Sequence, residues 1–404
     1  MPPARSPQSR RTGARTLTVL LAAAALAAGP LGAARSAPRP TDSEDVTQVS
    51  YRGHAFTVPA SWQIVDLEKH PDACVRFDRH AVYLGTPGGN QKCPARASGR
   101  TEALLVQPAR AAASAVSENP TARTYRATAD RITVTAAYGY DRTRIQDILR
   151  SAGLPVTATP GAPAALPAVA ALPADATSFR GEGFDACTAP SQSAMDAWRD
   201  NSGYGAVGVY IGGLNRACAQ QHLTADWVRT QYTRGWRFFP LYVGRQPSSD
   251  GGSCGGGCAA ITSPVAQGTA AADDAAAQAA ALGFGKGTVL YNDLEHYEPG
   301  KTVTAQVLGY IDAYTERLHA LGYRSGAYGN TSSLVADLIA NRADVTLPDV
   351  IHFARWNGTS TTSDASIPST LWAKHQRIHQ YVGDTTETHG GVTISIDRDR
   401  LDVD

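Results

Sequence analysis

Two carboxylates stand two residues apart at the end of an apolar segment of the chain. The segment runs from Thr288 to Asp293, and Glu295 follows it closely. Because side chains alternate between the two faces of a β-strand, both acids are expected to point the same way from the carboxyl end of a strand. In α/β barrels, this end of the strands carries the chemistry. The pair therefore marks a candidate acid–base site.

Other polar side chains lie near the ends of other predicted strands. Asp185 ends the first strand, Gln380 lies in the seventh, and Asp397 ends the eighth. If the strands close into a barrel, these residues meet the first pair at one mouth. Aromatic rings there would stack on sugar rings while the acids bind hydroxyl groups. The aromatic candidates for substrate binding are Tyr210, Tyr242, Tyr291, Trp356 and Tyr381.

A structural role for the first-strand and eighth-strand acids stays open as an alternative. Asp185 and Asp397 would then be caps, or ion-pair partners of Arg245 and Arg355. Networks of ion pairs also gather acids at one place, so the clustering alone does not decide between the two roles.

Strands and helices alternate along the C-terminal part of the chain. The strands are predicted at Gly183–Ala186, Ala206–Ile211, Arg237–Val243, Thr288–Asp293, Arg324–Tyr328, Val350–Arg355, Arg377–Val382 and Val392–Asp397. The helices, which carry capping or glycine stop signals, are predicted at Ser191–Asn201, Thr224–Arg234, Ala270–Leu282, Ala305–Leu321 and Ser332–Ala340. This alternation predicts an α/β fold, a (β/α)8 TIM-type barrel of eight parallel strands, preceded by a small α+β module.

The chain divides into four sections by composition. Arginines before an apolar run and small residues after it predict an export signal peptide over residues 1–37. Residues 41–152 are predicted to form the small α+β accessory module, with strands at Ala55–Val58 and Ile132–Ala137 and a closing helix at Arg142–Ala152. Residues 153–178 are rich in proline and alanine and predict a linker, and residues 179–404 form the barrel.

Cysteine and charge content bound the function. Six cysteines in an exported chain suggest disulfides, with local pairs favoured: Cys74 with Cys93, Cys187 with Cys218, and Cys254 with Cys258. A metal clip at Cys254 and Cys258 is the weaker alternative, because no second ligand pair accompanies it, and we expect no metal and no cofactor. A net charge of +1 gives no electrostatic case for nucleic-acid binding.

Four short motifs carry a resemblance to a known family. They are GFDAC at 183–187, VYIGG at 209–213, YNDLE at 291–295, and IHQY at 378–381 followed by Ile396 and Asp397. With these motifs, residues 181–404 resemble the glycoside-hydrolase-like domain of secreted actinobacterial proteins (domain of unknown function 1906). The same residues are more distantly similar to the family 25 glycoside hydrolases, the barrel lysozymes.

The resemblance implies a function and roles for the acids. Glu295 corresponds to the general acid, and Asp293 would orient a 2-acetamido group or stabilise the charged intermediate. Asp185 and Asp397 correspond to the family's acids on the first and eighth strands. The implied protein is a secreted monomer, associated with the cell wall and without stable membrane insertion, that hydrolyses glycosidic bonds of peptidoglycan or another wall polysaccharide. A catalytically inactive barrel that binds wall glycan is the alternative.

Overall fold

The computed structural model describes residues 44–156, 169–247 and 257–404. The predicted signal peptide, residues 157–168 of the predicted linker and Cys254 lie outside these residues. Residues 44–404 form one compact unit. Within the described residues, no helix has both the length and the apolar composition needed to cross a membrane.

The first part of the unit is a small β-rich assembly that carries one helix. Strands β1 and β2 form an antiparallel hairpin, and β3, β4, β5 and β6 form a sheet in that order. The elements are β1 (Val46–Tyr51), β2 (His54–Pro59), β3 (Gln63–Asp66), β4 (Ala81–Leu84), β5 (Ala103–Asn119), β6 (Thr124–Ala137) and α1 (Arg142–Ser151). Alternate residues of β6 and one face of α1 fill a shared apolar core with Phe56 and Val58 of β2. The two strands and the closing helix expected from the sequence are confirmed.

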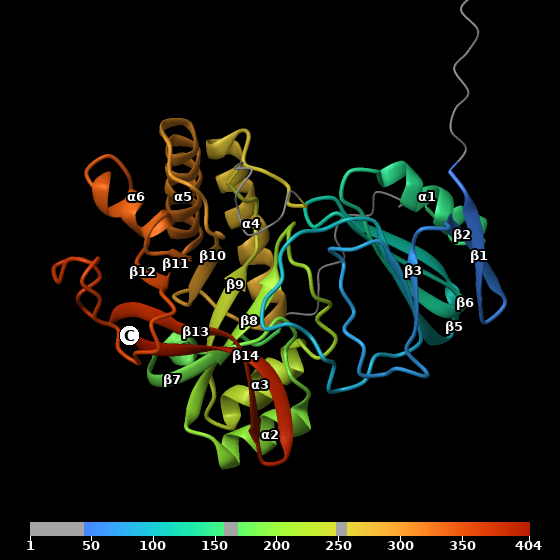
Figure 1. Ribbon diagram of the computed structural model, residues 1–404, viewed down its shortest axis with the longest axis horizontal. Helices are drawn as coiled ribbons and strands as arrows, with labels where there is room; N and C mark the ends of the chain where they lie inside the picture. Colours follow the sequence, from blue (N-terminus) through green and yellow to red (C-terminus); the bar gives the residue numbers. More distant parts are fainter. Residues whose placement is uncertain (1–43, 157–168, 248–256) are drawn as a thin grey trace, which may run out of the picture. The chain divides into compact units, whose positions relative to one another are not determined.

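The second part of the unit is a closed barrel of eight strands, in the order β7, β8, β9, β10, β11, β12, β13 and β14 (Figure 1). The strands are β7 (Phe179–Asp185), β8 (Tyr204–Gly212), β9 (Arg237–Tyr242), β10 (Val289–Asp293), β11 (Arg324–Asn330), β12 (Val350–Ala354), β13 (Gln376–His389) and β14 (Val392–Val403). The helices are a short 3-10 turn η1 (Ala174–Thr177), then α2 (Gln192–Asn201), α3 (Ala225–Thr233), α4 (Pro264–Leu282), α5 (Lys301–Leu321) and α6 (Leu334–Ala340).

Local sequence explains where the helices begin and end. The side chains of Ser191 and Thr224 accept hydrogen bonds from the first turns of α2 and α3. Gly283 and Gly322 end α4 and α5 in the left-handed conformation that glycine adopts without strain. Helix α4 begins at Pro264, earlier than the sequence predicted, because Gly268 allows the helix to lie against the backbone of α5: a Cβ there would be 2.3 Å from the Tyr310 carbonyl oxygen.

The prediction of eight parallel strands is wrong at the last strand. Neighbouring strands from β7 through β13 pair in parallel, but β14 is antiparallel to both β13 and β7. The five α-helices occupy the connections from β7 to β12, and the described connections after β12 carry none. The barrel is therefore a closed α/β barrel that departs from a regular (β/α)8 arrangement.

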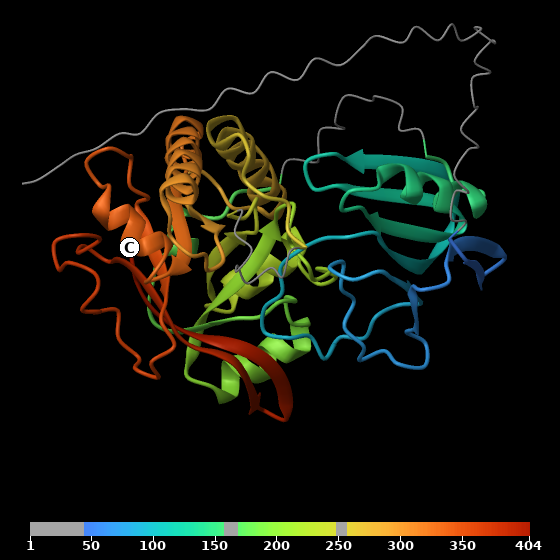
Figure 2. The same cartoon turned by 45° about the horizontal axis from the view of Figure 1, so that its top comes forward.

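The reversal follows from the turn between β13 and β14. Only Gly390 and Gly391 separate the strands, and both have positive φ, at 57° and 78°. Two positive-φ residues make the tight hairpin turn that suits the twist of antiparallel strands, whereas a parallel connection needs a dozen or more residues. The hairpin continues past the barrel as a long two-stranded ribbon, drawn in red in Figure 2.

Alternation along the strands divides the apolar residues of the barrel into two layers. One cluster joins strand residues such as Phe184, Phe238 and Leu290 to the helices. The other includes Phe239, Tyr291 and Tyr328, which belong to the opposite strand faces and fill the inside of the barrel. Apolar side chains thus fill the inside of the barrel along the strands, and polar groups lie above them at the strand ends.

Candidate functional site

Asp293 and Glu295 lie at the barrel mouth, by which we mean the end of the barrel at the carboxyl ends of its parallel strands. Asp293 is the last residue of β10, and the two side chains are buried. Gln246 holds the chain between them: its Nε2 donates to the Asp293 carbonyl at 2.8 Å, and its Oε1 accepts from the Glu295 backbone N–H at 2.8 Å. These two hydrogen bonds hold the backbone at both acids, and no local pattern in the sequence predicts them.

Asp185 and Asp397 are adjacent, although the predicted reason for their adjacency was wrong. Asp397 does not end a parallel strand; it lies midway along the antiparallel β14, where it pairs in register with Asp185 of β7. Gln380 joins them, with its Nε2 donating to Asp185 at 2.9 Å and to Asp397 at 3.3 Å. Its Oε1 accepts from Tyr328 and Trp356. Gln380 is therefore the centre of a buried polar network.

Two further residues of this network were missed by the sequence analysis. Asp399 lies two residues after Asp397, on the same face of β14, and accepts from or donates to His352 Nε2 at 2.8 Å. Both side chains are fully buried, and Asp399 Oδ2 has no hydrogen-bond partner. The i, i+2 spacing of the two aspartates was the available signal, the same spacing that marked Asp293 and Glu295.

Burial changes the protonation of these groups. It raises the pKa of Asp185 to about 7, with a contribution from the charge of Asp399. It raises the pKa of Asp397 to about 8, with a contribution from Asp185, and it raises the pKa of Asp293 well above its usual range, with a contribution from Glu295. Burial lowers the pKa of His352 to about 4. The cluster therefore binds protons at neutral pH while its imidazole is uncharged.

Arg96, from the loop before β5, reaches the barrel mouth. Its Nη1 donates to the Tyr328 hydroxyl at 2.8 Å, and its Nη2 lies 3.6 Å from Glu295 Oε2. The guanidinium also lies over the Trp356 ring, 4.9 Å from the ring centre. These groups line a cavity of about 190 Å³ together with His296 and Asn330. The sequence analysis had assigned no site chemistry to the part of the chain that supplies Arg96.

The predicted aromatic residues do not all reach this cavity. Trp356 lines it, and Tyr210 donates its hydroxyl to Asp185 at 2.8 Å beside it. Three others lie elsewhere: Tyr242 packs toward the helices and donates to Asp274, Tyr291 is sealed inside the barrel, and Tyr381 donates to Glu182. Strand alternation separates Tyr242 from the inner face, a distinction that depends on the register of each strand.

The position of Trp356 depends on a glycine in β13. A Cβ on Gly383 would be 1.9 Å from the indole ring, so any other residue would displace it. The indole N–H donates to Gln380 at 3.0 Å, yet the side chain remains 47% exposed. The ring is therefore held at its N–H edge, with the Arg96 guanidinium over it, and its exposed part can contact a ligand in the cavity.

The structure also answers the ion-pair alternative for Asp185 and Asp397. Arg245 donates to the carbonyl of Ala260, and Arg355 pairs with Asp364 at 2.9 Å. Neither arginine contacts the two aspartates, so the proposed partners are wrong. Within the part of the chain that the structure describes, Asp185, His352 and Asp399 form a candidate ligand set at this site: each offers a ligand atom, and these atoms lie within 4.8 Å of one another.

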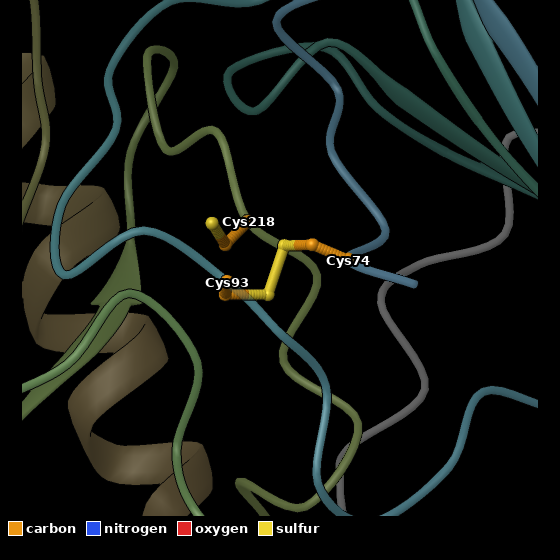
Figure 3. Close-up of side chains that lie close together, drawn as sticks. All are labelled: Cys74, Cys93 and Cys218. Carbon is orange, nitrogen blue, oxygen red and sulfur yellow. A yellow bond between two sulfur atoms is a disulfide. The ribbon is translucent and has the colours of Figure 1, made fainter. Parts of the chain in front are cut away.

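Two of the favoured cysteine pairs form disulfides in the structure, Cys74–Cys93 and Cys187–Cys218. Figure 3 shows the first disulfide beside Cys218. The third favoured pair includes Cys254, outside the described residues. The Cys74–Cys93 disulfide, which precedes Arg96 in the chain, packs against the Cys187–Cys218 disulfide of the barrel in one small buried cluster.

Comparisons with known proteins give one family and several similar folds. Residues 196–401 match the family model described as Rv2525c-like, glycoside hydrolase-like domain. An uncharacterized protein of B. stearothermophilus is 19% identical, with 55% of this chain and 95% of that chain covered and a TM-score of 0.38. The catalytic domain of endolysin ply40 from bacteriophage P40 of Listeria monocytogenes is 12% identical, covering 55% and 93%, with a TM-score of 0.34. The modular autolysin LytC of Streptococcus pneumoniae is 10% identical, covering 70% and 57%, with a TM-score of 0.37. No curated protein sequence matches the chain.

Proposed function

The chain belongs to the Rv2525c-like family of glycoside-hydrolase-like domains, and from this premise we propose that it hydrolyses glycosidic bonds of peptidoglycan or another cell-wall polysaccharide. Glu295 gives a proton to the leaving oxygen, and Asp293 beside it stabilises the positive charge that develops on the sugar or orients its 2-acetamido group. Asp185 and Asp397 act on this pair through their charge. Trp356 stacks against a sugar ring.

The observation that carries this proposal is the position of Glu295 at the wall of a cavity that Trp356 also lines, with Asp293 buried close to it. Glu295 and Trp356 line the same space of about 190 Å³. A paired acid and a stacking ring are the two features that cleavage of a glycosidic bond requires.

Proton supply follows from the burial of the pair. Burial, with the charge of Glu295, raises the pKa of Asp293 well above its usual range. Two close carboxyl groups in a poorly hydrated site share one proton at neutral pH, because ionising both places two like charges together. Transfer of that proton within the pair to Glu295 puts it at the cavity wall, where a glycosidic oxygen can receive it.

A second candidate function, glycan binding without turnover, is favoured by Arg96. Its guanidinium lies 3.6 Å from Glu295 Oε2, the distance of an ion pair. A mouth that keeps this arrangement when a glycan binds would retain the stacking face and the hydrogen-bonding groups but lack a proton donor.

We also propose the setting in which this site operates. Residues 1–37 act as an export signal, residues 41–152 as an accessory module, residues 153–178 as a linker, and residues 179–404 as the barrel domain. The mature protein is a secreted monomer at or near the cell wall. The two disulfides support this setting, since such bonds persist in oxidising compartments.

The test is release of new reducing ends from purified peptidoglycan and from chitin-type oligosaccharides, with products identified by mass spectrometry. The mature protein is compared with Glu295→Gln, which keeps the shape of the side chain and removes its acid. The matched control is Glu298→Gln, three residues further on, whose side chain is 79% exposed.

Release by the mature protein and the Glu298→Gln control, with loss in Glu295→Gln, supports the hydrolase. If no glycan yields reducing ends while glycan pull-down succeeds for all three proteins, the hydrolase is refuted and the binding function takes its place.

A further inference from the structure

The guanidinium of Arg96 projects into the cavity that contains the proposed proton donor. We infer that Arg96 is the specificity-determining residue of this site, and that it selects glycans carrying a carboxylate on the sugar bound at the mouth. The inference rests on the proposed site and names the class of its substrate, an acidic saccharide. Arg96 comes from the N-terminal part of the chain, so the barrel alone does not contain the complete site.

Several contacts fix the loop that carries Arg96. The Cys74–Cys93 disulfide lies three residues before it, and Thr188 of the barrel donates to Cys93 Sγ at 3.3 Å. After it, the Gly99 backbone N–H donates to the Asn215 carbonyl at 2.8 Å. The loop that carries Arg96 is therefore held against the barrel on both sides of this residue.

The guanidinium retains unused donors. An arginine has five N–H groups, and among the described residues Arg96 makes one hydrogen bond, to the Tyr328 hydroxyl. Its distance of 3.6 Å to Glu295 Oε2 is that of an ion pair without a hydrogen bond, and this oxygen is buried without a hydrogen-bond partner. The Arg96 side chain is 24% exposed, so a ligand in the cavity reaches it. A carboxylate there can accept two parallel hydrogen bonds from the guanidinium.

The charge of Arg96 is secure in this position. Burial opposes the charge, but the groups that face it are Tyr328, Glu295, Asp397 and Asp293, and their attraction raises the pKa of Arg96 above its usual value. A permanent cation surrounded by acids is normally a structural counterion. Here, however, the nearest acid is the one the chemistry needs in protonated form.

A ligand carboxylate at the mouth can pair with the unused N–H groups of Arg96, because it is a charged acceptor with two oxygens. A neutral sugar offers the guanidinium no charged acceptor. The preference for an acidic sugar follows from this contact.

Binding to matched sugars tests the selection without any requirement for turnover. The ligands are N-acetylmuramic acid against N-acetylglucosamine, and glucuronic acid against glucose, which differ in a carboxylate. Titration calorimetry is done on the full mature chain, on Arg96→Gln and on Arg96→Lys. The control is Lys92→Gln, which removes one positive charge from the same loop at a side chain that is 82% exposed.

The mature protein and Lys92→Gln should bind the acidic member of each pair at least about 10-fold more tightly, as expected for a hydrogen bond between charged groups. Arg96→Gln should bind both members alike. Arg96→Lys should keep part of the preference, because lysine retains the positive charge but cannot donate two parallel hydrogen bonds to a carboxylate. Equal preference in the mature protein and in Arg96→Gln, with both folded by circular dichroism, overturns the inference. So does equal binding of the two members by the mature protein.

The two proposals fail separately. Loss of the acid preference in Arg96→Gln supports the selection even if no glycan is cleaved, and only the hydrolase claim is then refuted. If cleavage occurs, and if peptide-free glycan strands with a free lactyl carboxylate and a neutral chitin oligosaccharide keep the same ratio of kcat/KM in Arg96→Gln as in the mature protein, the selection is refuted while the hydrolase stands.

Discussion

Two groups of buried acids lie within one barrel, and they differ in what balances their charge. Asp293 and Glu295 at the mouth face the guanidinium of Arg96. Asp185 and Asp399 lie deeper, are 0% exposed, and among the described residues have His352 as their one basic neighbour. That imidazole is uncharged at neutral pH because burial lowers its pKa to about 4.

The difference indicates separate roles for acids of the same type. The Arg96 guanidinium borders the cavity beside Glu295, so a ligand that enters the cavity can contact it. The deeper group, which we call the sealed acids (Asp185, Asp397 and Asp399), is balanced by protons and by hydrogen bonds from Gln380 and Tyr210, although Arg96 also faces Asp397. Such a group is a rigid support whose protonation follows folding and pH.

The largest expected effect on stability comes from removing the hydrogen bonds of the sealed acids. Gln380→Leu removes the side-chain amide that now makes hydrogen bonds with Asp185, Asp397, Tyr328 and Trp356. We expect the free energy of unfolding to fall by about 3 kcal/mol, measured by urea denaturation. A fall below about 1 kcal/mol would show that water or a rearranged neighbour replaces the amide, and the sealed acids would then not be a rigid support.

The pH dependence of stability should report the sealed acids between pH 6.5 and 8. Burial raises the pKa of Asp185 to about 7 and that of Asp397 to about 8, so the folded protein holds protons that the unfolded chain has lost. Stability is therefore lost as the pH rises through these values. The lowered pKa of His352 acts in the opposite sense, but it acts below pH 6.5, where the unfolded imidazole is protonated.

We expect a loss of about 2 kcal/mol between pH 6.5 and 8, measured by urea denaturation at both values. Asp397→Asn should reduce this slope, whereas Asp226→Asn, at a side chain that is 90% exposed, should leave it unchanged. A slope of the opposite sign in the mature protein would mean that the sealed acids are ionised when folded.

The stacking face at the mouth should affect binding more than stability. Trp356→Ala is expected to weaken glycan binding about 10-fold by calorimetry and to change the free energy of unfolding by less than about 1 kcal/mol, because the ring is largely exposed. Trp372→Ala is the contrasting variant, since this ring is 7% exposed. It should cost about 3 kcal/mol or more in stability. Equal binding of glycan by the mature protein and by Trp356→Ala would show that the Trp356 ring does not contribute to the binding site.

The smallest expected effect concerns Asp293 itself. Because its pKa is raised well above the usual range, the folded protein carries it in the neutral form, which asparagine imitates. Asp293→Asn should leave the free energy of unfolding at pH 7 within about 1 kcal/mol of the mature protein while reducing turnover. A large destabilisation would indicate that this carboxyl is ionised in the folded protein.

The sequence was informative where local spacing determines position. The i, i+2 pair at Asp293 and Glu295 predicted both the strand and the shared face, and the expected strands of the barrel all overlap strands in the structure. The direction of β14 was missed although Gly390 and Gly391 carry a hairpin signal, because a repeating strand–helix pattern was extended over it.

Other parts of the site have no local signal. Arg96 contacts Tyr328, which is 232 residues away in the sequence, and no local pattern predicts such a contact. Gln246 lies in a loop whose course depends on tertiary contacts. The aromatic predictions failed for a related reason: Tyr242 and Tyr291 sit on neighbouring parallel strands of one barrel, yet they belong to opposite layers, and only the register of the sheet distinguishes them.

The pairing of β14 with β7 has a consequence for how the protein folds. The first barrel strand to be synthesised stays at an open edge until the last one arrives, and until then Asp185 has no Asp397 beside it and no complete network around Gln380. Contacts between such distant segments form slowly, because loop closure must precede the stabilising interactions. The barrel therefore closes only after its final strand has emerged, and a chain interrupted before β14 would present the unpaired edge of β7 to solvent and to other copies of itself.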